Sequence, residues 1–235
     1  MSQFIDTVSN ISYPDSGLDI LGNQISLYGW VWKTSTSATP NVMIRGNGTG
    51  NQFMFQWTNP GDNDMYFGFW TAGAFALILR TFALTDITAF HHLAISYNGV
   101  LCKLYVDGIE RHSVAETRSI QAPAGGSFTV KSNSAGASSR FAHIGVHNVG
   151  LSAYEIQEAM RYGSTRRGLK GYWPLRTFGP RSPDLSGYGN YSIPTGGFST
   201  LAVDPPVIDR RRTPLIVPAA AAAGGGARSQ GIIIY

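Results

Sequence analysis

The stretch that decides the fold is Phe90-His-His-Leu-Ala-Ile-Ser-Tyr-Asn-Gly99, followed by Lys103-Leu-Tyr-Val-Asp-Gly108. The dipeptide Asn98-Gly99 separates two apolar runs, 91–97 and 101–106. Asn-Gly between such runs is the strongest short-range hairpin signal, because both residues accept the positive φ angles of a tight turn. We therefore predict two adjacent antiparallel strands here.

Short apolar runs bounded by turn residues recur along the chain. Charged residues make up only 14%, aromatic residues make up 12%, and there are 28 glycines. This pattern and composition are typical of an all-β sandwich with tight turns. We predict a two-sheet antiparallel jelly-roll sandwich, with further strands at 25–32, 42–45, 52–57, 65–70, 75–80, 128–131 and 140–146.

One short helix is predicted at 153–162. Ser152-Ala-Tyr-Glu155 matches a capping box, with Ser152 as N-cap and Glu155 at the third helical position. Gly163 ends the segment, and its apolar stripe comprises Tyr154, Ile156 and Met160.

The single cysteine, Cys102, excludes an internal disulfide. Strand alternation places it on a core face with Val100, Leu104 and Val106. We therefore interpret Cys102 as a buried structural thiol.

Four further motifs follow the hairpin: Phe141-Ala-His-Ile-Gly145, Leu151-Ser-Ala-Tyr-Glu-Ile156, Leu169-Lys-Gly-Tyr-Trp-Pro-Leu175 and Asp184-Leu-Ser-Gly-Tyr-Gly-Asn190. Together with the hairpin, these motifs resemble the laminin-G-like and pentraxin-like group of concanavalin A-like jelly rolls. The resemblance covers roughly residues 20–190 and implies the jelly-roll fold. It implies less about function, because this fold hosts lectins, hydrolases and adhesive modules.

No catalytic motif accompanies the fold signals. Glucanases of this fold carry Glu-x-Asp-x-x-Glu on a strand, since retaining hydrolysis needs two carboxylates about 5 Å apart. The nearest pair in this chain, Glu155 and Glu158, belongs to the predicted helix. We therefore expect no enzymatic activity. A degenerate hydrolase ranks third, after the two functions considered at the end of this section.

Metal ligands are equally sparse. His91 and His92 are adjacent on a strand and so point to opposite faces, while His143 and His147 share a face but are about 13 Å apart. Asp62-Asn-Asp64 supplies three oxygen ligands, and calcium takes six to eight. We expect no cofactor, and we keep calcium as a testable alternative.

Exposed aromatic side chains beside carboxylates would suit a glycan. The chain offers such a set around the 59–64 loop, although alternate residues of these strands can instead fill the core. The candidate glycan-binding residues are Trp57, Tyr66, Trp70, Asp62 and Asp64.

The C-terminal segment differs in composition from the rest. We divide the chain into a domain, 1–200, and an extended arm, 201–235, which is rich in Pro, Ala and Gly. An exposed Ile-Ile-Ile-Tyr end would be adhesive, so we expect the arm to lie on a neighbouring subunit, or alternatively to fold back on its own domain. Its candidate partner-binding residues are Arg210, Arg211, Arg212, Ile232, Ile233, Ile234 and Tyr235.

The formal net charge of +4 is concentrated in the C-terminal third. A basic region can meet nucleic acid or an acidic protein surface. We favour protein interfaces, because no nucleic-acid motif accompanies the charge and arginine is enriched at interfaces. The chain also shows neither a signal-peptide pattern nor a run long enough for a membrane span.

Proteins with this domain and a Pro-rich basic tail resemble virion accessory proteins of tailed bacteriophages. The resemblance implies a virion structural protein that decorates a capsid or joins head and tail, located in the virion. Its partners would be other virion proteins, in a homo-oligomer or a larger assembly. The alternative is a lectin-like module that binds host carbohydrate.

Deleting residues 213–235 should separate these roles. We expect the truncated domain to remain folded and soluble but to lose assembly with the particle, because ordering a long arm demands many contacts that repay its entropy. Incorporation can be quantified by gel densitometry of purified particles. Full occupancy by the truncated protein would contradict the arm's role.

Overall fold

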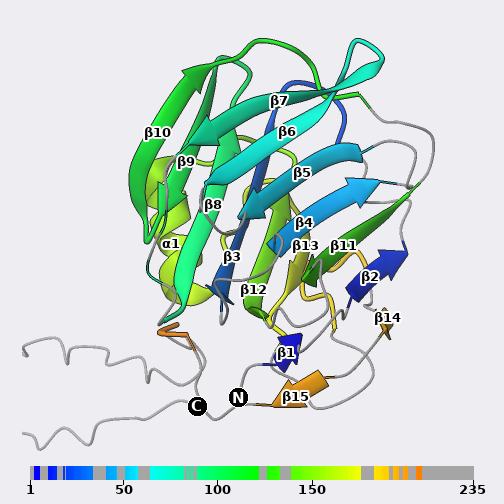
Figure 1. Ribbon diagram of the computed structural model, residues 1–235, viewed down its shortest axis with the longest axis vertical. Coiled ribbons are helices and arrows are strands. Elements are labelled where there is room, and N and C mark those ends of the chain that lie inside the picture. The colour runs from blue at the N-terminus through cyan, green and yellow to red at the C-terminus, as the bar shows by residue number, and fades with distance from the viewer. Residues whose placement is uncertain are drawn as a thin grey trace, which may run out of the picture.

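The computed structural model shows two antiparallel sheets packed face to face, with one helix outside them (Figure 1). The order in sheet A is β10-β9-β8-β3-β12-β1-β15, with β13 also paired to β12, and the order in sheet B is β14-β2-β11-β4-β5-β6-β7. This arrangement confirms the predicted sandwich. The structure describes residues 3–5, 10–14, 18, 20–33, 41–46, 51–57, 64–81, 84, 86, 89–121, 126–132, 139–175, 183–190, 193–195, 198–200 and 205–207.

The strands of sheet A are β1 (Gln3–Ile5), β3 (Ile25–Lys33), β8 (His91–Tyr97), β9 (Leu101–Val106), β10 (Ile109–Ala115), β12 (Ser139–His147), β13 (Leu169–Trp173) and β15 (Phe198–Thr200). The strands of sheet B are β2 (Asn10–Pro14), β4 (Asn41–Gly46), β5 (Asn51–Trp57), β6 (Met65–Thr71), β7 (Ala74–Thr81), β11 (Ser127–Ser132) and β14 (Ile193–Thr195).

The β8–β9 hairpin forms as predicted. The backbone N–H of Asn98 donates to the carbonyl of Leu101 (3.2 Å), and Gly99 has a φ of 89° that a side chain would strain. Cys102 is fully buried, and burial raises its pKa to about 12. The placement of Val100 on the core face was wrong, because Val100 belongs to the turn and is 61% exposed.

The strands that sequence patterning missed are short or polar. Three of them, β1, β14 and β15, have three residues each, too few to show an alternation. Strand β10 reads as polar because most of its side chains face solvent at the edge of sheet A. Pairing with strands distant in sequence defines β1, β14 and β15, and no local pattern does.

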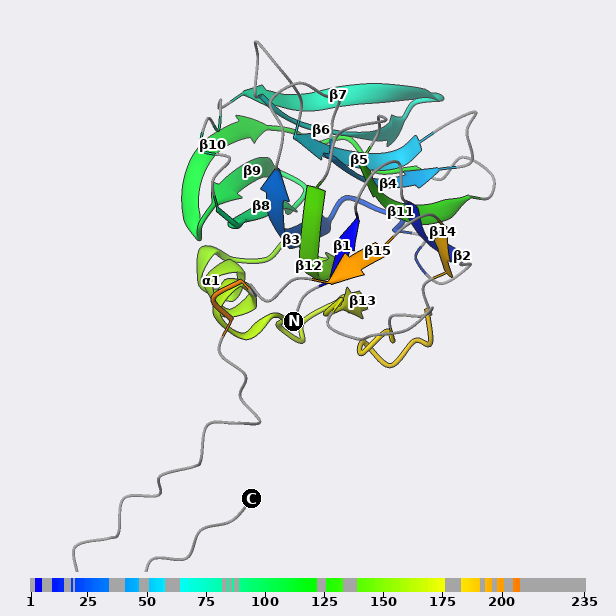
Figure 2. The same cartoon turned by 60° about the horizontal axis from the view of Figure 1, so that its bottom comes forward.

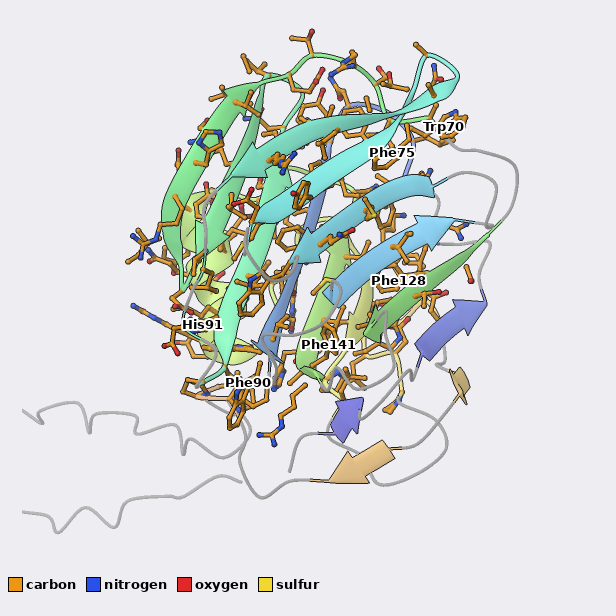
Figure 3. All side chains as sticks on the ribbon, viewed as in Figure 1. Trp70, Phe75, Phe90, His91, Phe128 and Phe141 are labelled. Carbon is orange, nitrogen blue, oxygen red and sulfur yellow. The ribbon has the colours of Figure 1, made fainter. Side chains whose placement is uncertain are left out.

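Aromatic side chains from both sheets form the core between them. Phe128 of sheet B stacks on Trp173 of sheet A with ring centroids 5.3 Å apart, and Phe69 stacks on Tyr97 in the same way. Phe128 and Phe141 point into the space between the sheets (Figure 3). Such rings contribute large buried areas and hold the two sheets in one relative position.

Helix α1 (Ala153–Tyr162) covers the outer face of sheet A, on the side away from sheet B (Figure 2). Its buried residues are Ile156 and Ala159, which pack on Tyr28, Ala94 and Tyr105. Tyr154, predicted in the apolar stripe, is instead 70% exposed. Within the described part of the chain, no helix combines the length and hydrophobicity that a membrane crossing requires.

The predicted capping box is present at the start of α1. The backbone N–H of Glu155 donates to Ser152 Oγ (3.3 Å), and the N–H of Ser152 donates to Glu155 Oε2 (2.8 Å). Arg167 donates from both Nε and Nη2 to the same carboxylate. The cap therefore also ties the helix to the segment that leads into β13.

Replacing Ser152 by Ala should lower the free energy of unfolding by about 1 kcal/mol, because the N–H of Glu155 loses its acceptor. A matched Ser152→Gly variant should lose only a few tenths of a kcal/mol. Urea denaturation followed by circular dichroism measures both. Equal midpoints for Ser152→Ala and the parent would show that the cap contributes nothing.

Two of the buried histidines, His92 and His147, lie beside Tyr28 and are neutral. His92 packs against the rings of Tyr28 and Trp30, and burial lowers its pKa to about 3. His147 lies 3.3 Å from the Tyr28 hydroxyl and 2.8 Å from the Arg167 carbonyl, and burial lowers its pKa to about 4. Protonation of either imidazole would therefore destabilise the folded protein.

Lowering the pH should therefore lower the free energy of unfolding. The folded pKa values lie below the ordinary 6.5, so below pH 6.5 the unfolded chain binds protons that the folded chain does not, and stability falls as the pH drops toward 4. At pH 5 each histidine should remove about 2 kcal/mol. Urea titrations between pH 7.5 and 5 measure the loss, and His92→Phe should remove about half of it. Parallel curves for this variant and the parent would refute the assignment.

Candidate functional site

The two sheets differ in what covers their outer faces. Sheet A has α1 packed across it, whereas partly exposed aromatic side chains gather on the outer face of sheet B. These side chains come from the neighbouring strands β6 and β7. This surface is therefore the candidate site.

Strand alternation explains which residues reach this surface. In β6, Met65, Phe67 and Phe69 are fully buried between the sheets, so the residues between them face outward. The β7 residues paired with them share that face. Ile78 forms a bulge without a partner in β6, so the register shifts by one residue there. We define the outer aromatic face by Tyr66, Gly68 and Trp70 of β6 and their β7 partners Arg80, Leu77 and Phe75.

Gly68 forms the floor of this face. A Cβ atom at Gly68 would lie 2.6 Å from the ring of Phe75 and 2.5 Å from the Ala76 carbonyl oxygen. The Phe75 ring therefore lies over the glycine, next to its register partner Trp70. Figure 3 shows Trp70 and Phe75 together at one end of sheet B.

A polar group flanks the rings. The guanidinium carbon of Arg80 lies 5.0 Å from the centroid of the Tyr66 ring, and Arg80 Nε is 3.6 Å from Asp64 Oδ2. The Arg80 side chain is 54% exposed and that of Asp64 is 25% exposed. Stacking on Tyr66 and pairing with Asp64 hold the Arg80 side chain beside the aromatic rings.

The structure separates the predicted glycan residues. Tyr66, Trp70 and Asp64 lie together on or beside the outer aromatic face, whereas Trp57 points into the core and is 1% exposed. Asp62 lies outside the described residues. Sequence reasoning missed Phe75 and Arg80, because the bulge at Ile78 interrupts the alternation that would have placed them.

The environment of Glu155 does not suit it to act as a general acid with Glu158. Arg167 bonding lowers the pKa of Glu155 to about 2, so this carboxylate stays ionised and cannot donate a proton near neutral pH. The capping box and the ion pair already account for its position.

Metal binding is not indicated by the described residues either. Among them, no group of three or more His, Cys, Asp or Glu side chains could hold an ion. His91 and His92 do point to opposite faces: His91 Nδ1 lies 2.8 Å from Asp107 Oδ2, while His92 lies under the helix. Residues 61–63, which include part of the Asp62-Asn-Asp64 calcium candidate, lie outside the described residues.

Most of the predicted arm lies outside the described residues, including 210–212 and 232–235. Residues 205–207 are described, and Pro205 is buried. Figures 1 and 2 both place this segment beside α1. The arm's predicted contacts with other subunits remain a prediction.

Comparison with known families identifies the class of protein. Residues 6–157 match the model of a laminin-G-like family described as "Concanavalin A-like lectin/glucanases superfamily". The chain therefore belongs to this superfamily. The jelly-roll resemblance in the sequence is thus confirmed. A comparison with curated proteins gives no match.

Solved structures share the fold at low identity. A candidate carbohydrate-binding protein from Bacteroides ovatus superposes with a TM-score of 0.57 at 13% identity, and the match covers 84% of this chain and 61% of that one. The carbohydrate-binding module CBM40 of the Ruminococcus gnavus IT-sialidase, bound to α2,3-sialyllactose, gives 0.50 at 18% identity, covering 68% and 99%. At these identities the likeness shows the fold alone.

Proposed function

We propose that this protein is a carbohydrate-binding module that holds an oligosaccharide on the outer aromatic face of sheet B, without turning it over. The observation that carries the proposal is the arrangement of Tyr66, Trp70 and Phe75 beside Arg80 and Asp64. Membership of a superfamily that includes lectins supports it.

The chemistry of this face suits sugars. A pyranose ring presents an apolar C–H surface edged by hydroxyl groups, so it needs a flat apolar partner and polar groups at the rim. The aromatic rings provide the first, and Arg80 and Asp64 are the polar groups at the rim.

The spacing favours a chain over a single sugar. Tyr66 and Trp70 are four residues apart on one strand, which places them about 13 Å apart, with Gly68 and the overlying Phe75 ring between them. The rings thus line an extended surface longer than one monosaccharide. An oligosaccharide lying along β6 would contact all of them.

Removing either of two aromatic rings should weaken binding. Wild-type protein on a glycan array identifies the ligands, and titration calorimetry then measures affinity. Trp70→Ala and Phe75→Ala should each weaken binding at least tenfold, about 1.4 kcal/mol, because a stacked ring and its desolvated surface are lost.

The matched control is Tyr154→Ala, which removes an aromatic ring that is 70% exposed on α1, on the far side of sheet A. Its affinity should equal that of the parent. Absence of any glycan ligand for the wild type, or equal losses in all three variants, would overturn the proposal. The predicted virion role depends on the arm, most of which lies outside the described residues. Deletion of 213–235 tests that role separately from glycan binding.

A further inference from the structure

The edges of the two sheets are unequal. Among the described strands, the sheets end at β15, β14, β10, β7 and β13, which branches from β12. The outer side of β13 is already bonded to residues 184 and 185. β14 and β15 are only three residues long, and β10 carries Glu110, Arg111 and His112 around a bulge. Short length, charge and bulges are the devices that keep an edge from pairing with another strand.

Strand β7 lacks most of this protection. Ala74 to Leu79 are all apolar, and the charge of Arg80 comes only afterwards. The bulge at Ile78 divides the strand and leaves Ala74–Leu77 as a regular stretch of four residues. This stretch can accept the backbone of a further strand.

The side chains beside this edge also lack cover. Leu77 faces outward and is 47% exposed. Ala74 and Ala76 share a face with the inward residues Thr71 and Phe69, yet Ala74 is exposed and Ala76 only half-buried. Small residues at the inward positions leave the rim of the sandwich open. An added strand with large apolar side chains would close it.

We propose that the arm folds back on its own domain, the alternative to a contact with a neighbouring subunit. In this arrangement Ile232-Ile-Ile-Tyr235 adds to the β7 edge as a short strand, paired with Ala74–Leu77. The four residues are β-branched or aromatic, the types that favour strands, and their number matches the regular stretch. Backbone pairing at a sheet edge accepts such a segment, and the side-chain positions select for apolar residues.

The length of the connecting chain permits this docking. The segment 205–207 lies beside α1, on the side of the sandwich opposite β7 (Figure 2). The intervening 208–231 can extend about 80 Å at about 3.3 Å per residue. A domain of about 200 residues has a radius of gyration of about 16 Å, so the segment can pass around it. Pairing of four residues is weak between separate molecules, but tethering gives a millimolar effective concentration.

Hydrogen exchange on the full-length protein tests the docking. In the parent, the edge-facing amides of 74–77 should be protected. Ile233→Asp places a charge within the added strand and should speed their exchange at least tenfold. The control variant Ser229→Asp puts the same charge outside the pairing segment and should leave the rates unchanged. Peptides from β9 report whether either variant perturbs the fold.

The outcomes discriminate clearly. Equal exchange rates of 74–77 in the parent and in Ile233→Asp would overturn the proposal. Light scattering should show a monomer for both proteins across a hundredfold range of concentration. An oligomer that Ile233→Asp dissociates would instead assign the edge to a second copy and overturn docking within one molecule.

Discussion

The burial of both faces of strand β3 is the constraint on which the rest of the structure depends. Leu27 and Val31 face the core between the sheets, and Tyr28 and Trp30 face helix α1. A central strand with two apolar faces must be covered on both sides, because either face left in water would forfeit a large hydrophobic contribution. Sheet B supplies one cover and the capped helix supplies the other.

This double burial controls the charge state of the histidines. His91 and His92 are neighbours in sequence, yet alternation sends them to different environments. Hydrogen bonding to Asp107 raises the pKa of His91, whereas burial under the helix lowers that of His92. Adjacent residues of one type thus respond oppositely to the protein around them, because desolvation and a nearby carboxylate act in opposite directions.

Sheet B, by contrast, needs only one buried face. Phe53, Phe67 and Phe69 provide the core contacts, and the outward residues of the same strands are not required for them. Rings such as Trp70 and Phe75 can therefore serve a ligand at little cost to stability. Within single strands, the fold thus separates the face that forms the core from the face to which we assign the proposed binding.

The sequence by itself determined the elements that local interactions specify. Asn98-Gly99 fixed a turn, Ser152 and Glu155 fixed a helix start, and alternation fixed the inward residues of β6. Only the tertiary structure decided that Trp57 points inward, that the bulge at Ile78 brings Phe75 and Arg80 to the face of Tyr66, and which face remains uncovered. Those outcomes depend on pairing between residues distant in sequence. A periodic pattern states that a strand has two faces, but the partners that pack against it decide which face meets water.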